Sequence, residues 1–163
     1  MHNTDVEAIL DDCLSDLIRI EAIIEGNKLA PSVKYLTAYA LIRSCSTIER
    51  CFKKVIADRL EILAPIMSEY LQKEVRKSPA NPRYGRMIDF LCRYKKAWGD
   101  DFKVTVTGRS DASRIQSSLE SLVNNRNTFA HNGSCACTFD DIRNYYVDST
   151  EFIQIMDDVV SRP

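Results

Sequence analysis

An apolar period of three and four residues runs from Tyr35 to Leu63, and it constrains the fold of this chain more than any other feature. Ten side chains carry the period: Tyr35, Leu36, Tyr39, Ile42, Ile48, Phe52, Val55, Ile56, Leu60 and Leu63. An α-helix has about 3.6 residues per turn, so this spacing is typical of a helix of about eight turns. Pro31 and Ser32 predict where this helix begins, and Pro65 predicts its interruption. A helix with so many apolar side chains favours a fold in which helices pack on one another.

The same period predicts further helices over residues 4–26, 66–76, 84–98, 111–132 and 138–159. The residues Thr4 to Glu7 and Thr138 to Asp141 have the pattern of capping boxes, Gly26 predicts a helix end and Asp111 a helix start. One segment differs, because FKVTVT at 102–107 alternates with a period of two and predicts a short extended stretch, too isolated for a sheet. The fold class expected is an all-α bundle of five or six helices, forming a single domain over residues 1–163.

The composition narrows the class of protein. Hydrophobic residues make up 45% of the 163 residues and charged residues 28%, which is typical of a globular domain. The formal net charge is −1, so a nucleic-acid partner would have to be bound by a local basic patch. No stretch approaches the roughly 20 apolar residues of a membrane span, and the N-terminal segment is acidic. We therefore expect a cytoplasmic protein without membrane contact.

Neither the cysteines nor the carboxylates predict a metal site. Four of the six cysteines lie within helical apolar patterns, where a thiol behaves as a small hydrophobic group. Cys135 and Cys137 form a single C-x-C, whereas structural zinc sites usually combine two pairs of ligands. The acidic pairs at 140–141 and 157–158 are neighbours on a helix and point in different directions. We expect reduced thiols, no metal and no cofactor.

The segment NNRNTFAHNG at 124–133 carries the candidate chemistry. Asn127 and His131 lie one turn apart on one helix face, and Arg126 projects beside them. Gly133 can end the helix in the left-handed conformation. One interpretation is an ordinary helix end, in which polar side chains satisfy carbonyl groups and the helix dipole. The other is a functional site, because histidine titrates near neutral pH and arginine binds phosphate through two donors.

The pattern Arg126-Asn127-x-x-x-His131 before Gly133 resembles the signature of the HEPN superfamily. A second match lies in LIRSCSTIERCFKKVI at 41–56, where Ser46 and Glu49 have the spacing of a small polar residue and a glutamate in that family. The order of the expected helices also agrees, so the resemblance covers most of the chain. Among the branches of the superfamily, the chain most resembles the RiboL-PSP and MAE-type HEPN proteins.

The resemblance implies a metal-independent endoribonuclease of a toxin–antitoxin or antiviral defence system. It would act as a homodimer with a composite active site, in which the 2′-hydroxyl of RNA attacks and a 2′,3′-cyclic phosphate forms. Carried over to this sequence, the catalytic residues would be Arg126, Asn127 and His131, with Glu49 and Ser46 supporting them. An antitoxin or a nucleotidyltransferase is a further expected partner. The alternative is a non-catalytic HEPN scaffold that dimerises or binds a nucleotide or a protein.

Several residues near the motif keep two interpretations. Glu49 either forms an ion pair with Arg43, Arg50 or Lys53 on a solvated face or holds Arg126 or His131 in place. The basic segments 49–54, 76–86 and 93–96 either are solvated faces or line a path for RNA. Tyr145 and Tyr146 have the spacing of core residues rather than of a platform for stacked bases.

Overall fold

The computed structural model describes residues 1–162, apart from the side chain of Leu71. Within these residues the chain forms seven α-helices and one short 3₁₀ helix. In chain order they are α1 (Thr4–Gly26), α2 (Val33–Leu63), η1 (Pro65–Met67), α3 (Ser68–Lys77), α4 (Tyr84–Tyr94), α5 (Lys96–Thr107), α6 (Ala112–Asn132) and α7 (Phe139–Ser161). The predicted all-α bundle is confirmed, with one helix more than the larger number expected.

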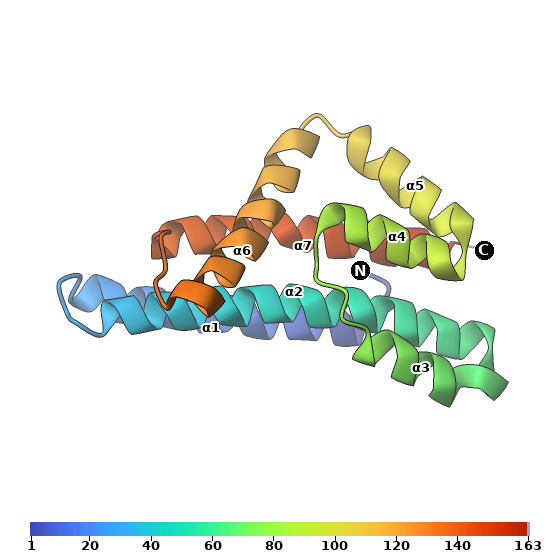
Figure 1. Cartoon of the computed structure of the whole chain (residues 1–163), viewed down its shortest axis with the longest axis horizontal. Coiled ribbons are helices and arrows are strands. Elements are labelled where there is room, and N and C mark those ends of the chain that lie inside the picture. Colours follow the sequence, from blue (N-terminus) through green and yellow to red (C-terminus); the bar gives the residue numbers. More distant parts are fainter. Residues whose placement is uncertain (163) are drawn as a thin grey trace.

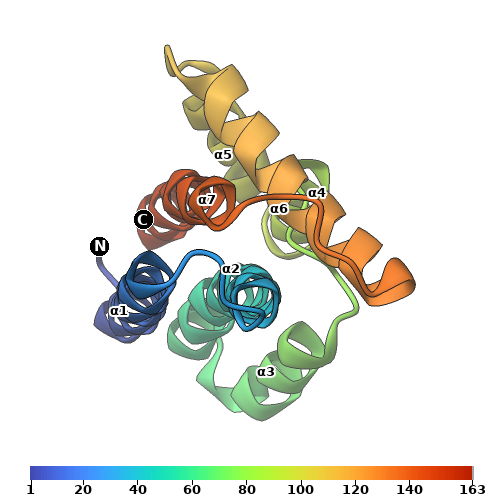
Figure 2. The same cartoon turned by 90° about the vertical axis from the view of Figure 1, so that its left-hand side faces the viewer.

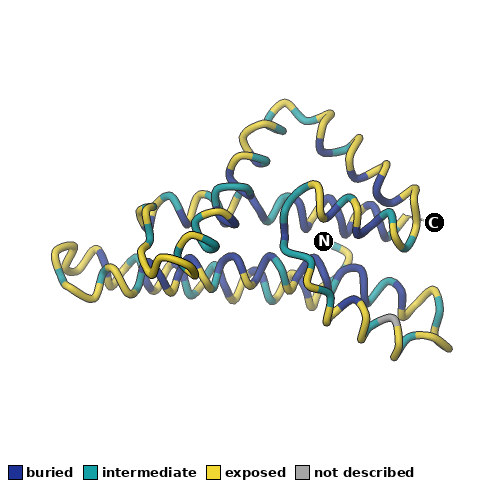
Figure 3. The backbone as a smooth tube through the Cα atoms, viewed as in Figure 1, coloured by how far each residue is buried: buried dark blue, intermediate teal, exposed yellow. Residues whose placement is uncertain are grey.

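The centre of the bundle is formed by α1, α2 and α7. Figure 1 shows α1 antiparallel to α2, while α7 runs along α2 in the same direction. Seen end-on in Figure 2, these three helices pack side by side, and α6 crosses them obliquely. The buried residues of α1 recur every three or four positions: Val6, Leu10, Cys13, Leu17, Ile20 and Ile24. Figure 3 shows that the buried parts of α1, α2 and α7 form one core, whereas the end of α6 is exposed.

The expected extended segment at 102–107 is wrong, because these residues form the second half of α5. Trp98, Phe102 and Val106 follow one another at four-residue spacing and are all buried. Phe102 packs on Phe152 of α7 with 6.3 Å between the ring centroids, whereas Val104 is 69% exposed. The alternating valines and threonines favour a strand only weakly, so the burial of three large side chains against the bundle decides the structure.

A short break after Tyr94 separates α4 from α5, so the helix expected to reach Trp98 ends four residues earlier. Lys95 has φ −150° and ψ 112°, which is an extended conformation between two helices. The chain turns back tightly here, since a Cβ atom on Gly99 would lie only 2.1 Å from Sγ of Cys92. The glycine therefore permits the close approach of α4 and α5.

Two helix starts that the sequence predicted have different outcomes. The cap of α1 is Asn3 rather than Thr4, because the Asn3 side chain accepts a hydrogen bond from the N–H of Val6 at 3.1 Å. The capping box of α7 is confirmed: the hydroxyl of Thr138 accepts from the N–H of Asp141 at 3.1 Å, and the Asp141 carboxylate accepts from the N–H of Thr138 at 3.0 Å. The hydrogen bonds from Thr138 lower the pKa of the Asp141 carboxyl group.

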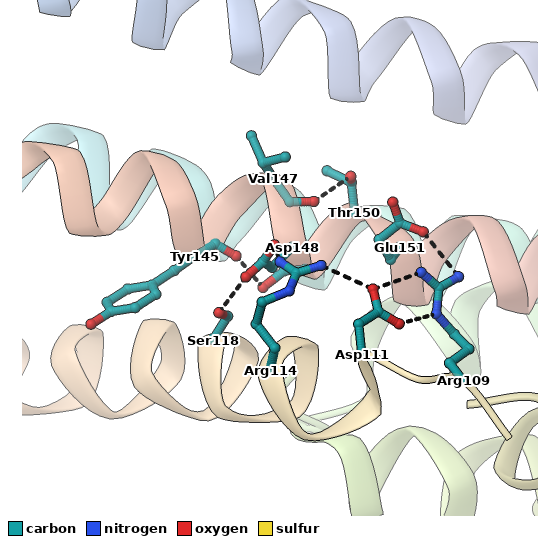
Figure 4. Close-up of polar contacts among 10 residues, drawn as sticks. Arg109, Asp111, Arg114, Ser118, Tyr145, Val147, Asp148, Thr150 and Glu151 are labelled. Atoms are coloured by element: carbon teal, nitrogen blue, oxygen red, sulfur yellow. Dashed lines mark hydrogen bonds and ion pairs between the residues drawn. The ribbon is translucent and has the colours of Figure 1, made fainter. Parts of the chain in front are cut away.

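A polar network fixes the beginning of α6 on α7 (Figure 4). The sequence predicted that Asp111 caps α6, and Asp111 is the residue before this helix, but its side chain makes no capping hydrogen bond. Its carboxylate is occupied by two arginines instead. Arg109 donates to this carboxylate at 2.8 and 3.0 Å, and Arg114 donates to it at 2.9 Å. Both arginines lower the pKa of Asp111, and the hydrogen bond from Arg109 has the largest effect. Arg114 also contacts Asp148 of α7, to which the hydroxyl of Ser118 donates at 2.6 Å. The helix that carries the motif is therefore anchored at its first turns.

Candidate functional site

The motif occupies the last two turns of α6. Gly133 has φ 67° and donates its N–H to the carbonyl oxygen of Phe129 at 2.8 Å, which is the left-handed helix end that the sequence predicted. Phe129 is half-buried and packs against the core. Arg126, Asn127 and His131 are thus held on regular helix immediately before the chain turns away.

Arg126 reaches from α6 to α2. Its Nη2 atom lies 3.4 Å from Oε2 of Glu49, and the two side chains are 31% and 30% exposed. The guanidinium also lies near Cys45, one turn before Glu49 on α2. Burial raises the pKa of the Cys45 thiol, and the hydrogen bond and charge of Arg126 oppose that rise. The motif arginine therefore contacts the second helix through Glu49.

Glu49 has a second partner on its own helix. Its Oε1 atom lies 2.7 Å from Nζ of Lys53, which also donates to the backbone carbonyl of Ser78 at 2.7 Å. Lys53 is only 8% exposed, because the segment between α3 and α4 passes close to it. The carboxylate of Glu49 therefore bridges two cations. It forms the ion pair with Lys53 and also the contact with Arg126, which were alternatives from the sequence alone.

The remaining candidate residues are not joined to this pair. His131 and Ser46 are exposed and Asn127 is half-buried, and none of these three side chains makes a hydrogen bond to another described residue. The other histidine, His2, lies 3.3 Å from Asp158 of α7. The fold therefore brings together Arg126 and Glu49 and leaves the imidazole of His131 exposed.

The loop after α6 contains the two cysteines of the C-x-C. Their Sγ atoms are 3.4 Å apart, and the pKa of Cys137 is raised to about 12, first by burial and then by the hydrogen bond with Cys135. Among residues 1–162, no three His, Cys, Asp or Glu side chains are grouped as metal ligands. A pocket of about 990 Å³ borders this loop, but Phe129 and Gly133 represent the end of α6 in its lining rather than the three motif residues.

The tyrosines of α7 have different environments. Tyr146 is buried and donates its hydroxyl to the carbonyl oxygen of Leu10 at 2.8 Å, so it is a core residue as the spacing predicted. Tyr145 is half-buried and packs against the core. No helix in the described part of the chain has the length and apolar character required to cross a membrane.

A comparison with protein families identifies the same relationship that the motif suggests. The family model described as RiboL-PSP-HEPN matches residues 8–162. The chain belongs to this family. The matched residues include both segments of the candidate site, namely the α2 segment with Ser46 and Glu49 and the end of α6 with Arg126 and His131. It supports a HEPN-type function in general, and comparisons with curated proteins and with solved structures gave no match.

Two side chains near Glu49 were not predicted as parts of the candidate site. Cys45 was expected only as a small core residue, and Lys53 only as one of three possible partners of Glu49. Their positions at i−4 and i+4 from Glu49 were a usable signal, because residues four apart share a helix face. The Ser78 carbonyl that accepts from Lys53 carried no signal in the sequence.

Proposed function

We propose that this HEPN domain is a metal-independent endoribonuclease, with Arg126, Asn127 and His131 as its catalytic set. The observation that carries the proposal is the contact between Arg126 and Glu49, on a helix end where the exposed imidazole of His131 forms no hydrogen bond or ion pair with another described residue. Only Nη2 of Arg126 contacts Glu49, and at 3.4 Å, so other guanidinium donors remain for phosphate oxygens. A plain helix end does not require an arginine tied to a second helix.

The reaction needs a base, an acid and positive charge at the phosphorus. In the proposed step, His131 removes the proton of the 2′-hydroxyl, and the 2′-oxygen then attacks the adjacent phosphorus. The bond to the 5′-oxygen breaks, that oxygen takes a proton from an acid, and a 2′,3′-cyclic phosphate remains. Arg126 stabilises the added charge of the phosphorane, and Asn127, which cannot titrate, orients the imidazole or the phosphate.

A second copy of the chain would supply the acid, because the motif of one protomer contains a single imidazole. The surface of α2 supports such a homodimer. Tyr35, Tyr39 and Ile42 are 67%, 52% and 43% exposed. Ser46 and Glu49 continue this row, and at 100° per residue all five positions fall within about 80° of one helix face. An exposed apolar row that leads up to the candidate site is suited to pack on the same row of a second copy, which would bring the two sites close together.

Cleavage products and variants test the proposal together. We expect RNA cleavage to survive excess EDTA and to leave 2′,3′-cyclic phosphate or 3′-phosphate ends. His131→Ala should lower the rate by about 10²–10⁴-fold, the usual contribution of a general acid–base group. Arg126→Ala should be similarly severe, Asn127→Ala milder, and the double variant of Arg126 and His131 little worse than either single one. His2→Ala, which removes the other imidazole, is the matched control.

The outcomes that contradict the proposal are distinct. Strict dependence on magnesium or clean 3′-hydroxyl ends would indicate a different mechanism. A strict monomer in light scattering would remove the composite site. His131→Ala should leave the fold intact, because the exposed ring contributes only about 0.3–1 kcal/mol through the helix dipole. If His131→Ala unfolds the protein, or cleaves RNA at the wild-type rate as a folded dimer, the motif is an ordinary helix end.

A non-catalytic scaffold is the second candidate, and the exposed row on α2 favours it equally well. Tyr35 and Tyr39 would pair two copies or dock a protein whether or not RNA is cut. The scaffold predicts a dimer without nuclease activity, and it predicts that Tyr39→Ser breaks the dimer while His131→Ala has no effect on any function. The intact set of three motif residues favours the enzyme.

For the cellular role, we propose a toxin–antitoxin or antiviral defence system, and the resemblance to HEPN ribonucleases supports it. The partner would be an antitoxin or a nucleotidyltransferase encoded beside the gene. Growth arrest on expression of the wild-type chain, absent with His131→Ala and relieved by the neighbouring gene product, is the expected result. Normal growth with an active nuclease would contradict this role.

A further inference from the structure

A groove beside the candidate site carries a local positive charge that the net charge of the chain conceals. Its volume is about 680 Å³, and it is lined by the beginning of α1, one side of α2 and the last turn of α3. Four cationic and two acidic side chains border it, which leaves a net charge of +2 in a chain of net charge −1. We call it the α1–α3 groove.

The two acidic groups of the groove are already neutralised. Glu49 contacts Lys53 at 2.7 Å as well as Arg126, and Asp5 contacts Lys54 at 3.2 Å. Lys54 has a further carboxylate partner in Asp58 at 2.8 Å. The excess positive charge of the groove therefore does not reside on the two lysines.

Arg50 and Arg76 carry the excess charge. Both line the groove, both are exposed, and neither forms an ion pair with another described residue. One comes from α2 and the other from α3, so their guanidinium groups border the groove from two helices. An arginine without a carboxylate partner keeps its planar fork of donors for phosphate oxygens.

The groove is continuous with the candidate site through Glu49, which lines the groove and contacts Arg126. The exposed Ser46, one turn before Arg50, adds a hydroxyl donor on the same wall. No aromatic side chain is part of the lining, so nothing here offers a stacking surface to bases. The chemistry of the groove fits a phosphodiester backbone and not a base.

We infer that the α1–α3 groove binds the backbone phosphates of RNA that flank the cleaved bond, with Arg50 and Arg76 as the contacting residues. The inference rests on the proposed ribonuclease function, because the RNA strand is placed by its scissile phosphate at Arg126. It adds that RNA extending beyond the cleaved dinucleotide binds more tightly than the dinucleotide alone. Contacts in this groove are independent of base sequence.

The test uses Arg50→Gln, Arg76→Gln and their double variant in the full chain, with Lys103→Gln as the matched control. Lys103 is an exposed cation of α5, which both Figure 1 and Figure 2 show across the molecule from α1 and α3. Binding is measured by fluorescence anisotropy on a single-stranded RNA made uncleavable by 2′-O-methyl groups. Cleavage is measured on a long RNA and on a dinucleotide too short to reach the groove.

We expect the double variant to raise KM for the long RNA about tenfold or more, with kcat and cleavage of the dinucleotide unchanged. The slope of log Kd against log salt should become shallower by about 1.4, since each phosphate contact of a single strand contributes about 0.7. Lys103→Gln should behave as the wild type, and circular dichroism should report unchanged helicity for all variants.

Failure of this inference is separable from failure of the proposed function. If the wild type cleaves RNA and the double variant binds the uncleavable RNA like Lys103→Gln, the groove is not an RNA site. If the wild type cleaves nothing, the anisotropy series still decides: loss of binding in the double variant supports the groove, and unchanged binding overturns it. Inorganic phosphate that competes as well as RNA, with no dependence on RNA length, would identify a site for free anions and overturn the inference.

Discussion

Replacing Glu49 by glutamine separates the two contacts of this carboxylate. The amide keeps the size of the side chain and removes its charge, so both Arg126 and Lys53 lose their counter-ion. The Arg126 contact is long, at 3.4 Å, which weakens it. Both side chains are only about 30% exposed, however, and this partial burial places the contact near the upper end of the 0.2–1 kcal/mol measured for exposed pairs. At about 1.4 kcal/mol per tenfold, a misplaced Arg126 costs roughly fivefold in the rate of RNA cleavage.

The contact with Lys53 matters for stability instead. The Lys53 side chain is 10% exposed, and breaking a fully buried pair costs about 3–5 kcal/mol. Lys53 retains the Ser78 carbonyl and Glu49 is partly solvated, so we expect about 2 kcal/mol. In a domain of this size that lowers Tm by roughly 4–8 °C.

A second substitution distinguishes positioning from unfolding. Glu49→Gln combined with Lys53→Met removes the unpaired ammonium group, so Tm should recover by several degrees while the cleavage rate stays at or below that of the single variant. Glu25→Gln is the matched control, because the Lys28–Glu25 pair is 66% and 58% exposed and should affect neither quantity. The assays are thermal denaturation and initial rates on the same samples at saturating RNA, with and without added salt.

Two results would refute this reasoning about Glu49. If Glu49→Gln cleaves RNA at the wild-type rate with a lowered Tm, the carboxylate does not position Arg126. If the double variant recovers cleavage together with Tm, the loss of activity in Glu49→Gln came from destabilisation alone.

Two further predictions concern the fold. Gly99→Ala should destabilise the domain by about 1–3 kcal/mol, because the new Cβ would lie 2.1 Å from Sγ of Cys92. Gly85→Ala is the control: its Cβ would have nothing within 4 Å, so Tm should stay unchanged or rise. Equal Tm values for the two variants would contradict the close approach of α4 and α5. Asp141 has a lowered pKa in the folded protein, so its capping contribution is complete above the ordinary carboxyl pKa of about 3.9 and disappears as pH falls through the lower folded value. Asp141→Asn should therefore be less stable than the wild type at neutral pH, and its stability should fall less on acidification. Denaturation curves at several pH values measure both effects. The control is Asp140→Asn, because Asp140 makes no capping hydrogen bond, and identical behaviour of the two variants would refute the prediction.

The helices were predictable wherever the apolar spacing was long and the burial one-sided. The long period from Tyr35 to Leu63 predicted α2, and Pro65 predicted its end, because a missing N–H and a fixed φ act locally. The prediction of an extended segment at 102–107 was wrong because the alternating β-branched residues conceal a four-residue spacing from Trp98 to Val106. The packing partners that favour the helix lie 50 residues further along, at Phe152, and no local pattern shows them.

Less of the site could be predicted, for a similar reason. Helix geometry placed Asn127 and His131 one turn apart, and the left-handed Gly133 agrees with the predicted helix end. The pairing of Arg126 with Glu49 could be expected only from the family resemblance, because spacing says nothing about contacts between distant helices. Two arginines in the α1–α3 groove come from α2 and α3, and the sequence could not show that they face one space.

The contact between Arg126 and Glu49 joins positions 77 residues apart, and this separation matters while the chain is being made. During synthesis, Glu49 leaves the ribosome long before Arg126 and His131, and α6 gains its network with Asp148 only after α7 has followed. Closing so long a loop has an entropic cost that is offset only when the last helix docks. A nascent chain therefore holds the two halves of the candidate site apart until α7 has been translated. For a protein that would cut RNA, this order of assembly keeps the unfinished chain inactive beside the messenger RNA and ribosomal RNA that produce it.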